Sequence, residues 1–221
     1  MTAFDDVLST RRSVRGFLDN EIPAETLEEV FQLAQRAPSN CNVQPWVVHV
    51  ASGEACGRIR AKLMSAAKFI ENANPDWPPT EKYEGVYRER QVDAALQLYG
   101  AINVSRTDAA GRSEAFMRNF AFFGAPHVAF IFLPRPFEAF QAMDCGMYVQ
   151  TLMLAMMSRG IASCAQGALA LYPDLVREQF NVASDHRLLL GISFGYEDRG
   201  EKANAARVGR ADVDQAVQFH R

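Results

Sequence analysis

Three short segments rich in β-branched and aromatic residues limit most strongly what this chain can fold into. They are the runs at 46–51 (WVVHVA), 127–133 (HVAFIFL) and 188–196 (LLLGISFGY), and a shorter run of the same kind lies at 161–164. Such runs are typical of buried strands. The helical patterns between them are too irregular for a repeating barrel. The sequence therefore predicts an α+β protein with a central mixed or antiparallel sheet flanked by helices.

Helical periodicity accounts for most of the remaining chain. Leu27, Val30, Phe31 and Ala34 share one helix face, and Pro38 ends that helix. A short helix is also expected near the N-terminus, and others at 55–70, 81–103, 108–121, 142–159 and 173–180. The helix at 142–159 is apolar on nearly every side, so we expect it in the core. We interpret residues 1–221 as a single domain with a helical insertion at about 71–123.

Composition excludes several classes of function. The 221 residues are 48% apolar and carry a formal net charge of −3, whereas a nucleic-acid-binding protein normally has a basic face. No apolar run is long enough to span a membrane, and the N-terminus does not look like a signal peptide. We therefore expect a cytoplasmic protein whose substrate is a small molecule.

Common metal and nucleotide motifs are missing from the sequence. The four cysteines and four histidines show no metal-ligand spacing, so no metal site is expected. The glycine patterns of dinucleotide-binding and phosphate-binding loops are absent, and so is the elbow motif of serine hydrolases. Any cofactor must then be held by other means.

Four short segments are candidates for a binding site. RRSVR at 11–15 carries three guanidinium groups, which suit a phosphate or the polar edge of a heterocycle. The loop APSNCNVQPW at 37–46 is small and polar and joins a helix to a buried strand. Small residues surround Gln166 and Gly167 at the end of a strand, and Arg207 and Arg210 lie in a polar tail. Taken singly, each segment also fits an ordinary turn, loop or solvated tail.

Taken together and in this order, the four segments resemble the nitroreductase-type FMN flavoproteins. The resemblance runs from about residue 4 to 217, and FFGAP, CAQGALALYPD and LLLGISFGY are similar to the nitrobenzoate-reductase-like branch. It implies a nitroreductase-like fold, FMN as cofactor and NAD(P)H as electron donor. It also implies a homodimer with FMN at the subunit interface. The expected reaction is reduction of nitroaromatic or quinone-type acceptors by a ping-pong scheme, in which flavin N5 carries the hydride and no catalytic side chain is needed.

The resemblance also implies roles for individual residues. Arg15 is expected near flavin N1 and O2, where a cation favours the reduced flavin. Gln166 and Gly167 match a turn whose backbone N–H faces N5. Many relatives have Glu-Gly there, so Gln166 is a departure that changes the local charge. Asp144 and Met147 are expected close to the flavin. The full set of expected cofactor-binding residues is Arg11, Arg12, Ser13, Arg15, Pro38, Ser39, Asn40, Gln166, Gly167, Arg207 and Arg210, with Pro38, Ser39 and Asn40 supplied by the partner subunit.

The insertion and the polar tail are expected to contact a substrate or the partner subunit. The insertion is expected to form a lid whose aromatic side chains contact a planar substrate, and Arg88 or Arg90 to pair with a substrate carboxylate. Packing between subunits would use the same aromatic residues equally well. The tail after Tyr196 has no core-facing period, so we expect it to embrace the partner subunit. The aromatic residues of the proposed wall are Trp77, Tyr83, Tyr87, Phe120, Phe122 and Phe123.

Two other functions remain open at the level of sequence. One is a different flavin reaction on the same scaffold, such as enone reduction, reductive dehalogenation or dehydrogenation. The other is a flavin carrier without turnover.

Overall fold

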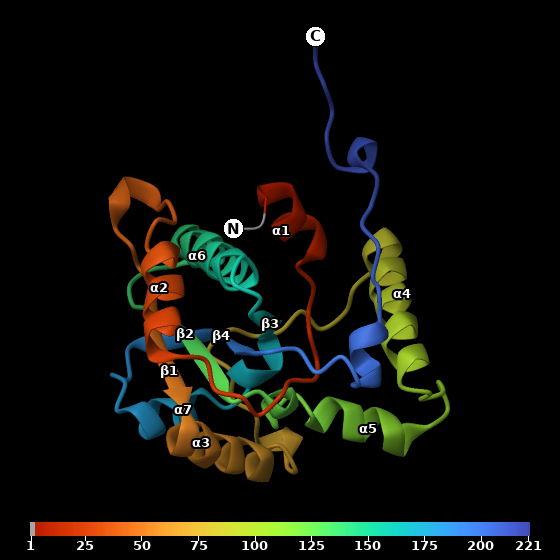
Figure 1. Cartoon of the computed structure of the whole chain (residues 1–221), viewed down its shortest axis with the longest axis horizontal. Coiled ribbons are helices and arrows are strands. Elements are labelled where there is room, and N and C mark those ends of the chain that lie inside the picture. Colours follow the sequence, from red (N-terminus) through yellow and green to blue (C-terminus); the bar gives the residue numbers. More distant parts are fainter. Residues whose placement is uncertain (1–2) are drawn as a thin grey trace.

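A four-stranded antiparallel sheet lies at the centre of the computed structural model, which describes residues 3–221 (Figure 1). Its strands are β1 (Val47–Ser52), β2 (His127–Pro134), β3 (Ala162–Gln166) and β4 (His186–Gly195), in the order β1-β2-β4-β3. All three strand pairs are antiparallel. The predicted α+β class is confirmed, and the sheet is antiparallel rather than mixed.

Helices cover both faces of the sheet. Side chains alternate along β2, so its residues are buried in two clusters, one on each face. Val128, Phe130 and Phe132 pack with α3 (Gly53–Ala66) and α7 (Pro173–Phe180). Ala129, Ile131 and Leu133 pack with α2 (Ala24–Ala34) and α6 (Ala139–Met157). The helix predicted at 173–180 is confirmed at both ends.

The prediction for α6 is only half right. Cys145, Tyr148 and Leu152 are buried against the sheet, as expected of a core helix. Phe140 and Met143, on another side of the helix, are 70% and 59% exposed. Periodicity cannot separate a side buried in the chain's own core from an apolar side left for another surface.

The remaining helices lie around this core. α1 (Phe4–Thr10) contacts α6, whereas α4 (Gly85–Ala101) and α5 (Ala109–Met117) stand to one side beside the C-terminal tail (Figure 1). The predicted helices at 81–103 and 108–121 are thus present but shorter. Asn103 breaks the first with a φ of 57°, and the Asp108 carboxylate caps the second by accepting from Gly111 N.

Residues 3–221 include neither a helix suited to crossing a membrane nor a group of side chains suited to holding a metal ion. No helix in this part of the chain is long and apolar enough to cross a membrane. Within the same range, no three or more His, Cys, Asp or Glu side chains are grouped so that they would hold a metal ion.

Candidate functional site

The RRSVR segment lies along the open edge of β3. α1 ends at Thr10, and the chain then runs extended, with Val14 N donating to Ser163 O at 3.1 Å. Ser13 forms an isolated parallel bridge with Ser163. Because Val14 is buried in the core and side chains alternate along an extended chain, Ser13 and Arg15 are directed away from that core.

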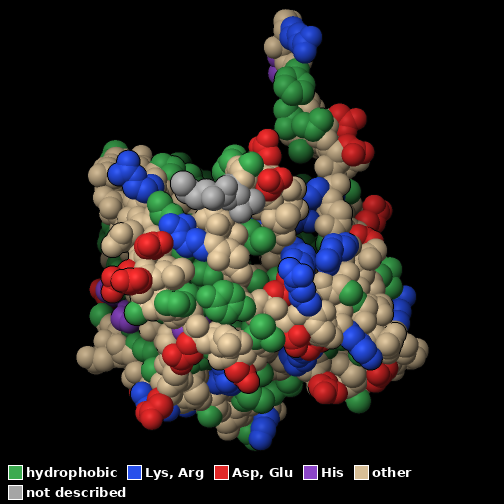
Figure 2. Space-filling model, in the orientation of Figure 1, with side chains coloured by type: hydrophobic (Ala, Val, Ile, Leu, Met, Phe, Trp, Pro, Cys, Tyr) green, Lys and Arg blue, Asp and Glu red, His purple; other side chains and the backbone are tan. Residues whose placement is uncertain are grey.

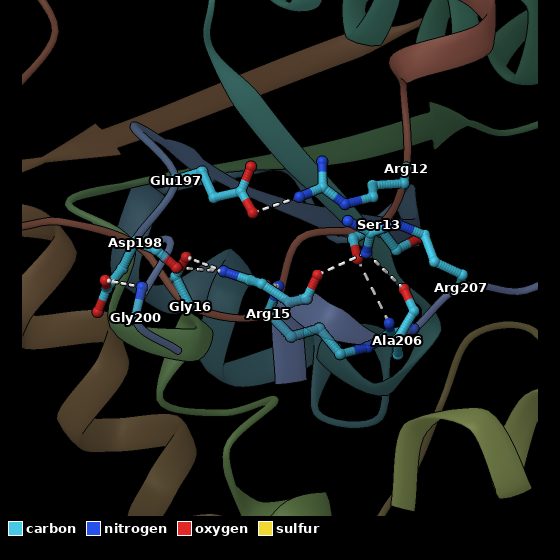
Figure 3. A network of polar contacts seen from close by, with 10 residues as sticks. Arg12, Ser13, Arg15, Gly16, Glu197, Asp198, Gly200, Ala206 and Arg207 are labelled. Carbon is cyan, nitrogen blue, oxygen red and sulfur yellow. Dashed lines mark hydrogen bonds and ion pairs between the residues drawn. The ribbon is translucent and has the colours of Figure 1, made fainter. Parts of the chain in front are cut away.

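The polar tail folds back against this segment (Figure 3). Arg12 forms an ion pair with Glu197. Further along, Asn204 is 5% exposed, and its Oδ1 accepts from Arg15 N at 2.6 Å. Arg207 Nη1 donates to Asn204 O at 2.7 Å. Residues 11–15 and 197–207, nearly two hundred positions apart in the sequence, therefore form one structural unit.

A cationic cavity of about 1130 Å³ opens between α1 and this tail. Figure 2 shows Lys and Arg side chains gathered on the same face, below the projecting C-terminus. Arg12 Nε is buried and has no hydrogen-bond partner within residues 3–221, so it is a donor left for a ligand. The volume is that of a cofactor site and the charge suits a phosphate. The cations lining the cavity are Arg11, Arg12, Arg199, Lys202, Arg207 and Arg210, against the carboxylates of Glu197 and Glu201.

The turn at Gln166 and Gly167 offers its backbone rather than its side chain. Gln166 is buried; its Nε2 donates to Asn119 O at 3.0 Å, and its Oε1 accepts from Ser193 Oγ. A Cβ added to Gly167 would meet no atom within 4 Å. The space beside this turn is open, which is what a backbone contact with a planar ligand requires.

The loop carrying Pro38, Ser39 and Asn40 lies elsewhere in the same chain. Asn40 N donates to the Asp144 carboxylate at 3.2 Å, which fixes the loop on α6. Cys41, next to it, has a φ of 48°. None of residues 37–44 lines the cationic cavity. Within one chain, the loop and the RRSVR segment are therefore not brought together.

Burial and hydrogen bonding set the pKa values of two groups at the site. Burial raises the pKa of the Cys164 thiol, although nearby Arg15 opposes the shift. Burial is the largest single influence on Glu201 and acts to raise its pKa, but the hydrogen bond and charge of Arg118, together with backbone hydrogen bonds from Ala203 and Lys202, hold the pKa below its usual value. At neutral pH, Cys164 is thus a protonated packing residue and Glu201 a carboxylate.

Comparison with known proteins assigns a family to this geometry. The family model described as "Nitroreductase family" matches residues 8–196. The chain belongs to the nitroreductase family.

Two curated relatives of this nitroreductase-family chain span its whole length. It is 42% identical to nitroreductase NfnB of Mycolicibacterium smegmatis over 220 residues, covering 99% of this chain and 93% of the relative. It is 33% identical to 4-nitrobenzoate reductase of Pseudomonas putida over 216 residues, covering 98% and 95%. Both fit the predicted nitrobenzoate-reductase-like branch.

Solved structures agree with this placement. The FMN-dependent nitroreductase NfnB from Mycobacterium smegmatis, in complex with NADPH, superposes with a TM-score of 0.94 at 41% identity, covering 98% of this chain and 97% of that one. An FMN- and NADPH-dependent NfnB from Sphigopyxis sp. strain HMH also gives 0.94, at 30% identity and 99% coverage of both chains. The nitroreductase-like fold is confirmed.

The aromatic wall expected in this nitroreductase's insertion is not assembled as predicted. Phe120 and Phe122 are fully buried in the core cluster on the α3 face, and Phe123 is 6% exposed behind Arg15. Phe120 and Phe122 are thus core residues and not part of an exposed wall, because the chain turns inward after α5, with φ values of 58° and 53° at Phe122 and Phe123. Phe123 lines a small pocket with Arg15, and its contact with a substrate stays a prediction.

The remaining aromatic residues of the insertion fall into two places. Trp77 packs against the second core cluster, with the Arg187 guanidinium 4.1 Å from the ring centroid. Tyr83 and Tyr87 are 44% and 66% exposed at the start of α4. Of the residues expected in the wall, these two tyrosines are exposed, and Phe116 on α5 is a further exposed aromatic residue of the insertion.

Arg199 and Lys202, which line the cavity, were not predicted from the sequence, and neither were three residues that act through hydrogen bonds: Asn204, Arg118 and Glu201. Arg118 Nη2 donates to Arg15 O at 3.0 Å and to Glu201 Oε2 at 2.7 Å. None of the three carries a local signature, since each acts on a segment far away along the chain.

Proposed function

We propose that this nitroreductase-family protein is an FMN-dependent oxidoreductase that passes electrons from NAD(P)H to nitroaromatic or quinone-type acceptors. The cationic cavity between the RRSVR segment and the tail carries the proposal, because its volume and charge suit a flavin mononucleotide. The full-length similarity to proteins described as FMN-dependent and NADPH-dependent nitroreductases supports the same reaction.

The residues present fit FMN at both of its ends. Arg11, Arg12, Arg207 and Arg210 line the cavity and would hold the phosphate. Ser13 and Arg15 continue along the sheet edge, where Arg15 would face the pyrimidine edge of the ring. The open space at Gly167 would let the ring approach the turn. When bound, FMN supplies the two-electron hydride chemistry at N5.

The side chains of the protein would position FMN and neutralise the negative charge that forms on it. The guanidinium of Arg15 would stabilise negative charge at the pyrimidine edge, so the protein favours the reduced cofactor. We expect donor and acceptor to use the space over the ring in turn, as a ping-pong scheme requires.

A homodimer completes this proposal. The loop of Pro38, Ser39 and Asn40 lies away from the cavity of its own chain, so it would serve the site of the partner subunit. The exposed apolar side chains of α6 and of the tail would be covered there. The chain 1–221 would then act as one FMN-binding domain, in a cytoplasmic location where its four free thiols stay reduced.

The deciding experiment is a visible spectrum recorded without oxygen. We expect a yellow protein whose flavin bands bleach on adding NADPH or NADH and return on adding a nitroaromatic compound. Bleached bands that return only with an enone, a halogenated substrate or another acceptor would move the reaction to a different flavin chemistry. Slow bleaching with both nucleotides would favour a carrier, and a colourless protein that takes up no FMN would contradict the proposal.

The phosphate contacts give a sharper test of the site. Replacing both Arg207 and Arg210 by Ala should weaken FMN binding by about 100-fold or more, since hydrogen bonds to charged groups are worth about 1.5–3 kcal/mol each and about 1.4 kcal/mol is tenfold. Riboflavin lacks the phosphate, so its affinity should hardly change. Arg58→Ala, at an exposed position on α3, is the matched control and should leave both affinities unaltered. Equal weakening for FMN and riboflavin would contradict the phosphate assignment.

A further inference from the structure

A single buried amide joins segments that the proposed function places at opposite ends of the cofactor. Asn204 Oδ1 accepts from Arg15 N at 2.6 Å, and its Nδ2 donates to Gly16 O at 2.9 Å and to Asp198 O at 2.8 Å. Its backbone oxygen accepts from Arg207 Nη1 at 2.7 Å. One residue thus links Arg15, expected at the pyrimidine edge, to Arg207, expected at the phosphate.

A second side chain holds the backbone carbonyl of the same residue, Arg15. Arg118, which follows α5, donates from one nitrogen to Arg15 O at 3.0 Å and to the Glu201 carboxylate at 2.7 Å. The N–H of Arg15 is therefore held by the tail and its carbonyl by the insertion. Such a residue has little freedom to shift its backbone.

The tail also lies tightly over Gly16. A Cβ added there would come within 2.1 Å of Glu201 Cγ and 2.4 Å of Glu201 Cβ. A glycine is needed because the Glu201 side chain occupies the space. The carboxylate of Glu201 also accepts the hydrogen bond from Arg118. The tail is therefore held at a fixed position relative to Arg15 by its contact with Gly16 and by its bond to Arg118.

We propose that Asn204 and Arg118 are positioning residues that set where the Arg15 guanidinium lies, and so set how strongly the protein prefers reduced over oxidised FMN. The inference rests on the proposed function and extends it to residues that would not themselves carry the chemistry. A cation stabilises developing charge only when it is held in place beforehand, because reorganisation during the reaction would cost the same energy.

The test compares the affinities for oxidised and reduced FMN in the holoprotein, obtained from the midpoint potentials of bound and free flavin. Asn204→Ala, which removes the amide without adding charge, should lower the preference for reduced FMN about tenfold, equal to about 30 mV for a two-electron couple. Asn74→Ala is the matched control. Its amide bonds to Asp174 far from the cavity, so it should lower thermal stability and leave the preference unchanged.

Arg118→Lys provides the second measurement, should Asn204→Ala fold poorly. Lysine keeps the charge, but its shorter side chain does not place an ammonium where the guanidinium Nη2 bridges Arg15 O and Glu201. The preference should fall in this variant as well. A wild-type preference in either folded variant, with only the melting temperature reduced, would overturn the inference and leave a merely structural role. A wild-type protein that takes up no FMN would instead overturn the proposed function.

Discussion

Both the nitrogen and the oxygen of the Gln166 side-chain amide form hydrogen bonds inside the protein. It donates to Asn119 O at 3.0 Å and to Asn119 Oδ1 at 3.2 Å, and it accepts from Ser193. Glu at this position would lose both donations and set a carboxylate against two oxygens. This departure from the Glu-Gly of many relatives is therefore matched by the neighbouring residues of this chain.

Gln166→Glu should accordingly lower the free energy of unfolding by about 1–3 kcal/mol, the cost of leaving buried polar groups unpaired. FMN should stay bound, because the turn would contact it through the backbone. Urea unfolding and a flavin spectrum measure the two effects. Ser193→Ala keeps the bonds to Asn119 and should cost less. A fully stable Gln166→Glu protein that releases its flavin would show that the side chain serves the cofactor instead.

The sequence predicted residues that form a local pattern, such as RRSVR and the loop at 37–46. Of the first pattern, Arg11 and Arg12 line the cavity, whereas Ser13 and Arg15 do not, and the contact of all four with FMN stays a prediction. Asn204 reaches back 189 positions to Arg15, and nothing beside it in the sequence indicates that contact. Its role comes from the folding of the tail onto the sheet edge, which no periodicity records.

At the scale of elements, the start of the insertion is anchored to the rest of the domain. The Asp76 carboxylate accepts from Arg177 at 2.6 Å and from Leu188 N at 2.7 Å, which ties the segment to α7 and β4. Trp77 stacks on Arg187 beside it. Beyond this anchor the insertion is exposed from Pro78 through the start of α4. The sequence predicted the helices here, since their periodicity is local, but the anchor depends on ion pairing across about a hundred residues.

Trp77→Ala should therefore lower the free energy of unfolding by about 2–3 kcal/mol, somewhat less than a fully buried aromatic residue, through lost packing and a lost cation–π contact. KM for nitroaromatic substrates should change little in the folded fraction. Tyr83→Ala, at an exposed position, should show the reverse pattern. Steady-state kinetics and urea unfolding of both variants measure this contrast. If Trp77→Ala raised KM at unchanged stability, the tryptophan would belong to the lid after all.

At the scale of the whole molecule, α6 and the tail both expose large apolar side chains. Phe140, Met143 and Met147 follow helical spacing on α6 and are 70%, 59% and 39% exposed. The end of the tail projects from the body of the chain (Figure 1), with Val213 and Phe219 64% and 74% exposed. A stripe and an arm of this kind are typical of a surface that binds another chain. The loop of Ser39 and Asn40 is bonded to α6 beside the stripe.

Met143→Asp tests whether that stripe forms the subunit interface. A carboxylate in the centre of an apolar contact would be buried without a partner, so the variant should sediment as a monomer at micromolar concentration. It should also bind FMN at least tenfold more weakly, because each site would lose the loop lent by the other subunit. Phe69→Asp, at a residue 56% exposed just beyond α3 on the opposite face, is the matched control and should stay dimeric and yellow. Since the chain's own cavity is unchanged in Met143→Asp, a monomer that kept its full FMN affinity would mean that the site is complete within one subunit.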